Sequence, residues 1–167
     1  SINKKTLLKI IKKTAFVIST DDLKPSITGL LLKIENNKIT AVATDGHRLA
    51  RYVFNDYSTD QFLGEVIIPR KFLKLLELII SENEKTQLWI GKNHATAEGE
   101  NTTIITKIID EKYPDYDSVI PRENKKVLVA NKERLYGAVK RVSIFSNKMT
   151  QQVSITAEKN LVSINTE

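Results

Sequence analysis

The chain has 167 residues, with 26 Lys and Arg against 20 Asp and Glu, which gives a formal net charge of +6. It contains no cysteine, which excludes disulfides, thiolate metal sites and cysteine nucleophiles and favours a cytoplasmic protein. No apolar run approaches the roughly 20 residues that a membrane-spanning helix needs. A hydrophobic content of 41% is typical of a soluble globular protein, long enough for one sizeable core but short for two complete domains.

The start of the chain predicts one helix followed by three strands. In the helical segment, apolar residues recur at three- and four-residue spacing and lysines take the opposite side, with Asn3 placed to cap the N-terminus. The turn-forming pair Asn36-Asn37 then predicts a hairpin, and Asp45-Gly46 predicts a second tight turn. The predicted elements are a helix over 4–15 and strands over 29–35, 38–44 and 48–54.

The same order of elements returns in the next part of the chain. A short strand over 66–68 leads to Pro69, a residue well suited to the first helical position, and an apolar face predicts a helix over 70–81. Three strands follow, over 86–90, 95–98 and 102–109. We therefore expect an α+β domain of about 120 residues built from two helix-plus-three-strand units.

After a charged linker at 122–126 the pattern of the N-terminus returns once more. Asn131-Lys132 and Leu135 repeat Asn3-Lys4 and Leu7 at an offset of 128 residues, and strands are expected over 153–157 and 161–166. One helix and one hairpin cannot close a core alone. We therefore expect a domain over 1–122 and an incomplete domain of the same type over 123–167, in a chain cut from a longer protein.

The positive charge is concentrated in the helical segments. Residues 1–15, 70–85 and 131–148 carry +5, +1 and +4, so the rest of the chain carries −4. Any amphipathic helix can show lysine to water, and that is one interpretation. The recurrence of the same sign in equivalent helices favours another, a stripe that binds the phosphate backbone of duplex nucleic acid without reading its sequence.

The turn at 44–49 permits two further interpretations. Asp45 beside His47 raises the possibility of a hydrolase, because an imidazole oriented by a carboxylate is the usual proton shuttle. The two side chains flank a tight turn and need not face each other, and no third partner is visible. Alternatively, the turn presents Arg48 and Leu49 as a fixed donor beside an apolar side chain, which suits an extended peptide. The sequence predicts no metal site, with His94 solvated in a turn, and no cofactor.

Four ordered motifs resemble the bacterial DNA polymerase III beta subunit family, the sliding clamps. The most specific is the run Ala43-Thr44-Asp45-Gly46-His47-Arg48-Leu49-Ala50. The others are Asp22-Leu23-Lys24-Pro25 followed by Gly29, Ile68-Pro69-Arg70-Lys71, and Tyr113-Pro114-Asp115-Tyr116 leading to Val119-Ile120-Pro121. The resemblance covers essentially the whole chain, and assigns it to the middle domain and the first part of the third domain.

The resemblance implies a DNA-clamp fold with antiparallel sheets outside and helices inside a ring. Two head-to-tail subunits form the ring, and duplex DNA passes through the hole, so the protein confers processivity on a polymerase without being an enzyme. By position, the residues implied to face DNA are Lys5, Lys9, Lys12, Lys13, Arg70, Lys71, Lys140 and Arg141. An open, sequence-independent DNA-binding domain is the alternative, and it would bind short linear duplex with submicromolar affinity.

The resemblance also implies a pocket that binds short linear motifs of the replicative polymerase, the clamp loader and repair proteins. The matching positions are Lys24, Ile27, Thr44, Gly46, His47, Arg48, Leu49, Pro114 and Val119. Family members often have Arg where Lys24 stands, and a lysine cannot make the same bidentate contact. Ile144 and Phe145 match the contact positions of the homodimer interface, although the end of an amphipathic helix explains them equally well. We expect that this chain by itself does not form the ring.

Overall fold

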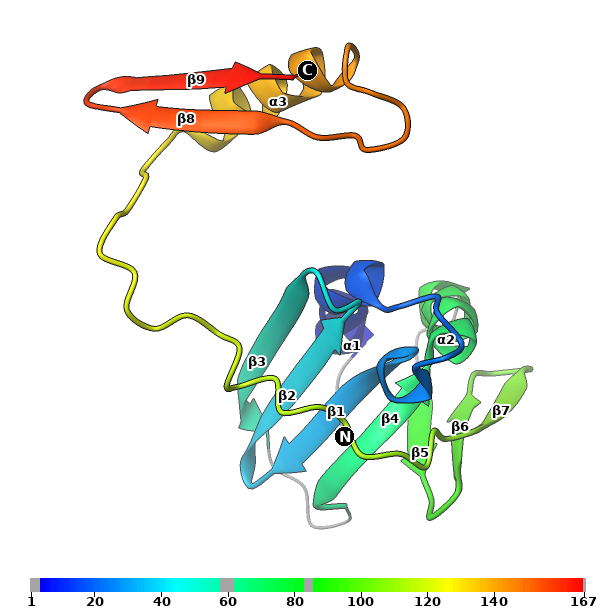
Figure 1. Ribbon diagram of the computed structural model, residues 1–167. Helices are drawn as coiled ribbons and strands as arrows, with labels where there is room; N and C mark the ends of the chain where they lie inside the picture. The colour runs from blue at the N-terminus through cyan, green and yellow to red at the C-terminus, as the bar shows by residue number, and fades with distance from the viewer. Residues whose placement is uncertain (1–3, 58–61, 83–85, 167) are drawn as a thin grey trace. The chain divides into compact units, whose positions relative to one another are not determined.

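The computed structural model describes residues 4–57, 62–82 and 86–166. The chain divides into two compact units, Ser1–Ile120 and Pro121–Glu167, each of which is considered by itself (Figure 1). No helix in the described ranges is long and apolar enough to cross a membrane.

The first unit contains two helices and seven strands in the order that the sequence predicts. They are α1 (Lys4–Thr14), β1 (Gly29–Glu35), β2 (Asn37–Thr44), β3 (Leu49–Tyr57), β4 (Gly64–Pro69), α2 (Arg70–Glu82), β5 (Gln87–Ile90), β6 (His94–Glu98) and β7 (Thr103–Lys107). Two short 3-10 helices, Ala15–Val17 and Pro25–Ile27, were not predicted. All strand pairs are antiparallel, so the predicted α+β fold is confirmed.

The strand at 64–69 joins the first sheet and not the second. The sheets have the strand orders β3-β2-β1-β4 and β5-β6-β7, so β4 pairs with β1 on the side opposite the β1–β2 hairpin. The expectation that Pro69 opens α2 is wrong by one residue, because Pro69 pairs with Gly29 as the last residue of β4, and α2 begins at Arg70. Pro tolerates this place because its missing N–H costs nothing at a strand end.

One hydrophobic core unites both helices with one face of each sheet. Leu7 and Ile10 of α1 and Leu76 and Ile80 of α2 pack in the same cluster as Leu30 of β1. The cluster continues into the second sheet through two buried alanines of β6, whose small side chains allow a close approach. Figure 1 shows the two helices side by side behind the strands of the first sheet. The apolar stripe that each helix carries in sequence is therefore the face that it buries.

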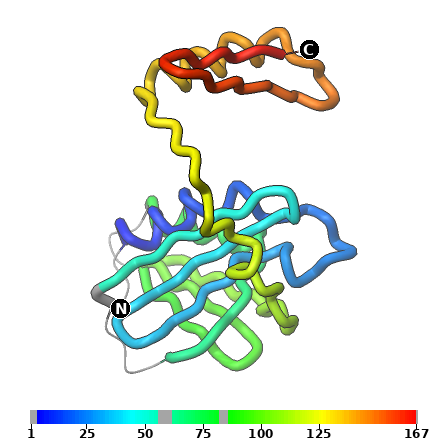
Figure 2. Tube along the Cα trace, turned by 60° about the vertical axis from the view of Figure 1, so that its left-hand side comes forward, coloured from blue at the N-terminus to red at the C-terminus, as the bar shows by residue number. Residues whose placement is uncertain are grey.

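The opposite face of the four-stranded sheet, called the open face below, is not covered by α1 or α2. The segment after β7 crosses this open face, as both views show (Figure 2). Its Tyr113 joins Leu31 and Val42 in a second, smaller cluster, and Asp117 forms an ion pair of 3.2 Å with Arg51. The backbone of Ile109 bridges to Ile67, which attaches the segment to β4.

The second unit contains α3 (Lys132–Ser143), β8 (Ser154–Glu158) and β9 (Leu161–Asn165). The helix starts at Asn131, whose side chain accepts a hydrogen bond of 3.0 Å from the backbone N–H of Arg134. This is the cap expected from the repeat, while its counterpart Asn3 lies outside the described residues. In this unit no residue of α3 is buried.

Candidate functional site

A stripe of lysines runs along the solvent side of α1. The lysines opposite the core are exposed and share one side of the helix, because Lys5, Lys9 and Lys13 recur every four residues and Lys12 lies three residues after Lys9. The ammonium group of Lys9 lies 5.8 Å from the centre of the Tyr52 ring on β3, which directs this lysine toward the sheet. The structure thus brings together the four lysines that the sequence assigns to α1.

The first turn of α2 adds positive charge beside α1. The ammonium group of Lys4 donates to the carbonyl oxygen of Ser81 at 3.4 Å, so the N-terminus of α1 meets the C-terminus of α2. Lys71 is exposed and Arg70 half-buried. Lys74, three residues after Lys71 and also exposed, belongs to the same helix face and was missed by the sequence analysis, although its spacing is visible there.

After Lys74 the solvent face of α2 carries exposed leucines and no basic residue. Leu75 and Leu78 are exposed by 50% and 54%. The exposed basic residues of this helix are therefore confined to its first turns, before Leu75, and the net charge over 70–85 is only +1.

In the second unit the assigned residues lie on the surface of α3 and directly after it. Lys140 and Arg141 are exposed in its last turn. Ile144 and Phe145 follow with exposed fractions of 74% and 81%.

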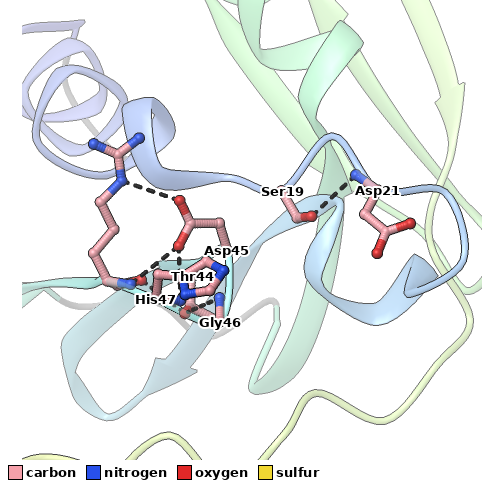
Figure 3. Close-up of polar contacts among 7 residues, drawn as sticks. Ser19, Asp21, Thr44, Asp45, Gly46 and His47 are labelled. Atoms are coloured by element: carbon pink, nitrogen blue, oxygen red, sulfur yellow. Dashed lines mark hydrogen bonds and ion pairs between the residues drawn. The ribbon is translucent and has the colours of Figure 1, made fainter. Parts of the chain in front are cut away.

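The turn between β2 and β3 is organised by the carboxylate of Asp45. Its Oδ1 accepts the backbone N–H groups of His47 and Arg48, each at 3.0 Å, and its Oδ2 accepts Nε–H of Arg48 at 3.0 Å (Figure 3). The two backbone hydrogen bonds, followed by the Arg48 guanidinium, lower the pKa of Asp45 to about 2. Gly46 has a φ of 92°, a conformation that glycine adopts without strain.

These contacts disfavour the hydrolase interpretation. The Asp45 carboxylate accepts the backbone N–H of His47 and does not contact the imidazole ring in any hydrogen bond. It also accepts the backbone N–H and the Nε–H of Arg48. A carboxylate that serves a catalytic histidine must instead accept from the imidazole ring. Within the described ranges, no three His, Asp or Glu side chains gather as a metal site requires.

A loop from Ser19 to Thr28 lies beside this turn. The hydroxyl of Ser19 accepts the N–H of Asp21 at 3.1 Å, and Asp21 in turn accepts the N–H of Leu23 at 3.0 Å (Figure 3). The short helix that follows places Lys24 in solvent and buries Ile27. The same loop therefore presents one charged and one apolar residue of the predicted peptide site.

Two apolar members of the predicted site, Ile27 and Leu49, meet on the open face of the first sheet, whereas Pro114 and Val119 lie outside this cluster. Ile27 is 6% exposed within the smaller cluster, and half-buried Leu49 packs against that cluster. Tyr113, which precedes Pro114, forms its centre and was missed because the sequence shows it only as part of a loop motif. Pro114 is exposed, and Val119 is exposed by 68%.

A cavity of about 500 Å³ extends along the same face beyond the cluster. Its charged lining is mutually paired: Lys33 lies 3.5 Å from Glu65, and Lys38 lies 2.9 Å from Glu35. The two carboxylates raise the pKa of Lys33, and the hydrogen bond from Lys38 lowers that of Glu35. No residue predicted for the peptide site except Pro114 lines this cavity.

Comparisons with known proteins point to one protein family. Residues 1–115 match the family described as DNA polymerase III beta subunit, central domain. The chain is 31% identical over 165 residues to the beta sliding clamp of Pseudomonas aeruginosa and 36% identical over 162 residues to that of Haemophilus influenzae. These matches include 98% and 95% of this chain but only 45% and 43% of the two relatives. The chain therefore spans less than half the length of each relative.

Solved structures show the same similarity. The crystal structure of the DNA polymerase sliding clamp from Pseudomonas aeruginosa superposes with a TM-score of 0.89 at 30% identity, over 99% of this chain and 46% of that one. The sliding clamp from Bacillus subtilis gives a TM-score of 0.89 at 26% identity, over 98% and 44%. The chain therefore belongs to the DNA polymerase III beta subunit family, the bacterial sliding clamps.

Proposed function

We propose that this chain is part of a ring that encircles duplex DNA and confers processivity on a replicative polymerase without catalysing a reaction. The observation that carries the proposal is the lysine stripe of α1, which places four exposed lysines on the side of the helix opposite the core. A surface of this kind neutralises phosphates without contacting bases, as sliding along DNA requires.

The same proposal assigns a role to the open face of the sheet. The turn at 44–48 and the apolar cluster around Tyr113 form a docking place for a short peptide segment of a partner protein. Ile27 and Leu49 offer apolar contact, while Arg48 and exposed backbone offer hydrogen bonds. Polymerase, clamp loader and repair proteins are the proposed partners, and Ile144 and Phe145 the proposed contacts of a homodimer.

The DNA-facing surface is tested by removing charge from the stripe. Lys12→Gln with Lys13→Gln is compared with Lys92→Gln with Lys107→Gln, two exposed lysines of the second sheet, so that the net charge of both variants is equal. Binding of the chain to short linear duplex is measured by fluorescence anisotropy at several salt concentrations. If both stripe lysines contact phosphate, the first variant weakens binding and makes the log–log salt slope shallower by about two, whereas the second leaves both unchanged.

The affinity itself separates the two DNA-binding functions. A clamp is retained by its closed ring, so the chain alone should bind short duplex weakly. Submicromolar affinity would favour an open DNA-binding domain, and an unchanged salt slope in the stripe variant would remove α1 from the interface.

A further inference from the structure

Two buried side-chain hydroxyls of the first unit, those of Thr86 and Tyr113, have no hydrogen-bond partner among the described residues, and that of Tyr113 lies on the open face. Tyr113 is only 8% exposed, and its phenolic oxygen is fully covered yet forms no hydrogen bond there. Buried polar groups in folded proteins nearly always have a partner, so such an exception needs a physical explanation. Phenylalanine would fill the same space without this cost.

The apolar side chains that pack around Tyr113 cannot supply the partner, and the polar residues of the cavity that it borders, such as Thr40 and Asp115, form no hydrogen bond with it. The buried members of its cluster are apolar throughout: Ile27, Leu31, Val42 and Ile67. Packing against them are Leu49, Ile109 and the ring of Tyr116, whose centre lies 6.5 Å from that of Tyr113 in an edge-on arrangement. The ring of Tyr113 is therefore well accommodated, while its hydroxyl is not.

The neighbouring turn cannot supply the partner either, because its polar side chains are already engaged. The hydroxyl of Thr44 donates to the carbonyl oxygen of Arg48 at 2.8 Å and accepts the N–H of Gly46 at 3.1 Å. Both oxygens of Asp45 accept from within the turn. Among the described residues, the phenolic proton therefore has no acceptor.

The chemistry of the phenol narrows the choice of partner. Burial raises the pKa of Tyr113 to about 12, and the backbone of Thr44, which acts on the phenolic oxygen as a donor, opposes the shift. The group is therefore a neutral O–H at physiological pH, and an O–H buried among apolar residues needs an uncharged acceptor. A carboxylate would lose its hydration there without a counter-ion, whereas a peptide carbonyl would not.

We propose that Tyr113 is a specificity-determining residue of the peptide site and that its hydroxyl donates to a main-chain carbonyl of the docked segment. This inference rests on the proposed function. The half-buried Leu49 is the side chain that moves aside, so that an apolar residue of the peptide enters the cluster and carries its carbonyl to the hydroxyl. The free protein tolerates the unpaired hydroxyl of Tyr113, and the bound peptide supplies its hydrogen-bond acceptor.

The test compares Tyr113→Phe with Tyr116→Phe, which removes a hydroxyl from the neighbouring ring of the same segment. The probe is a synthetic peptide with the C-terminal residues of a bacterial replicative polymerase, titrated into the labelled chain and followed by amide chemical shifts. Tyr113→Phe should weaken peptide binding about fivefold, which corresponds to the free energy of one hydrogen bond. Tyr116→Phe should leave peptide binding unchanged. Without peptide, Tyr113→Phe should unfold at the same or a higher denaturant concentration than the unmodified chain.

The two measurements separate the failure of this inference from that of the proposed function. If Tyr113→Phe lowers the stability of the free chain, the hydroxyl already has a partner, such as water, and the inference is wrong. If the unmodified chain and Tyr113→Phe bind the peptide equally, the inference is wrong while peptide docking stands. If the unmodified chain binds no peptide, the proposed docking fails and this inference fails with it.

Discussion

Arg48 is tied to Asp45 at two points, through its backbone N–H and through its Nε–H, each 3.0 Å from a different oxygen of the carboxylate. One side chain thereby fixes both the path of the turn and the direction of the guanidinium. The exposed fraction of the Arg48 side chain is nevertheless 64%, so it remains available to a partner. The turn is therefore ordered before any peptide binds, which reduces the loss of conformational entropy on binding.

Replacing Asp45 should therefore loosen the turn. Asp45→Ala removes the acceptor of two backbone N–H groups and should lower the free energy of unfolding by about 1 kcal/mol. Asp45→Asn keeps one carbonyl oxygen for those amides and should lose less. Chemical denaturation measures both, and equal losses in the two variants would show that the charge, and not the acceptor geometry, holds the turn.

The ionisation of Asp45 should be visible in acid. Its pKa in the folded chain is about 2 against an ordinary 3.8, so the ionised form stabilises the fold. That contribution is complete above about pH 4 and is lost as the pH falls through about 2. Carbon-13 NMR of the side-chain carboxyl should give the low value directly. Arg48→Gln should raise it only in part, because the backbone N–H bonds are the larger cause, and a full return to 3.8 would contradict that order.

The docking place predicts the effect of a paired substitution. Arg48→Ala with Leu49→Ala removes a hydrogen-bond donor and an apolar contact. The double substitution should weaken binding of the polymerase-tail peptide by roughly tenfold or more. A matched control is Arg134→Ala with Leu78→Ala, which removes the same two side-chain types from the exposed surfaces of α3 and α2. Isothermal calorimetry or NMR titration measures both. Unchanged affinity in the first pair would remove Arg48 and Leu49 from the site.

Most of the fold could be predicted because its signals are local. The helix at α1 has a 3.6-residue apolar period, and the strands are bounded by turn residues, so element types and near-correct limits follow from short windows. The partner of β4 could not be predicted in this way. Its pairing with β1 joins segments about 35 residues apart and depends on the close approach at Gly29, which no local pattern records.

The same distinction applies to the sites. The lysines of α1 share one helix face, so their common surface is visible in the spacing. Tyr113, in contrast, reaches Ile27 and Leu31 only because the chain after β7 crosses the open face of the first sheet. Neither periodicity nor turn chemistry predicts such a crossing. Whether the Tyr113 hydroxyl has a hydrogen-bond partner also depends on residues that are distant in the sequence.

The close approach of β4 and Ile109 to Gly29 predicts a sharp loss of stability on substitution. A Cβ on Gly29 would lie 2.7 Å from both Cγ2 of Ile67 and the carbonyl oxygen of Ile68, and 2.9 Å from Cδ1 of Ile109. The carbonyl oxygen belongs to β4, so it cannot move away without disturbing the pairing with β1. Gly29→Ala should therefore destabilise the first unit by about 1–3 kcal/mol, the usual cost of overpacking. The control is Gly91→Ala, whose Cβ would meet only the carbonyl oxygen of His94, at 3.3 Å. Denaturation followed through amide signals of β1 and β4 measures the difference. A Gly29→Ala chain as stable as the control would mean that the two strands can separate there, and that the path from β4 into α2 is less constrained than this contact requires.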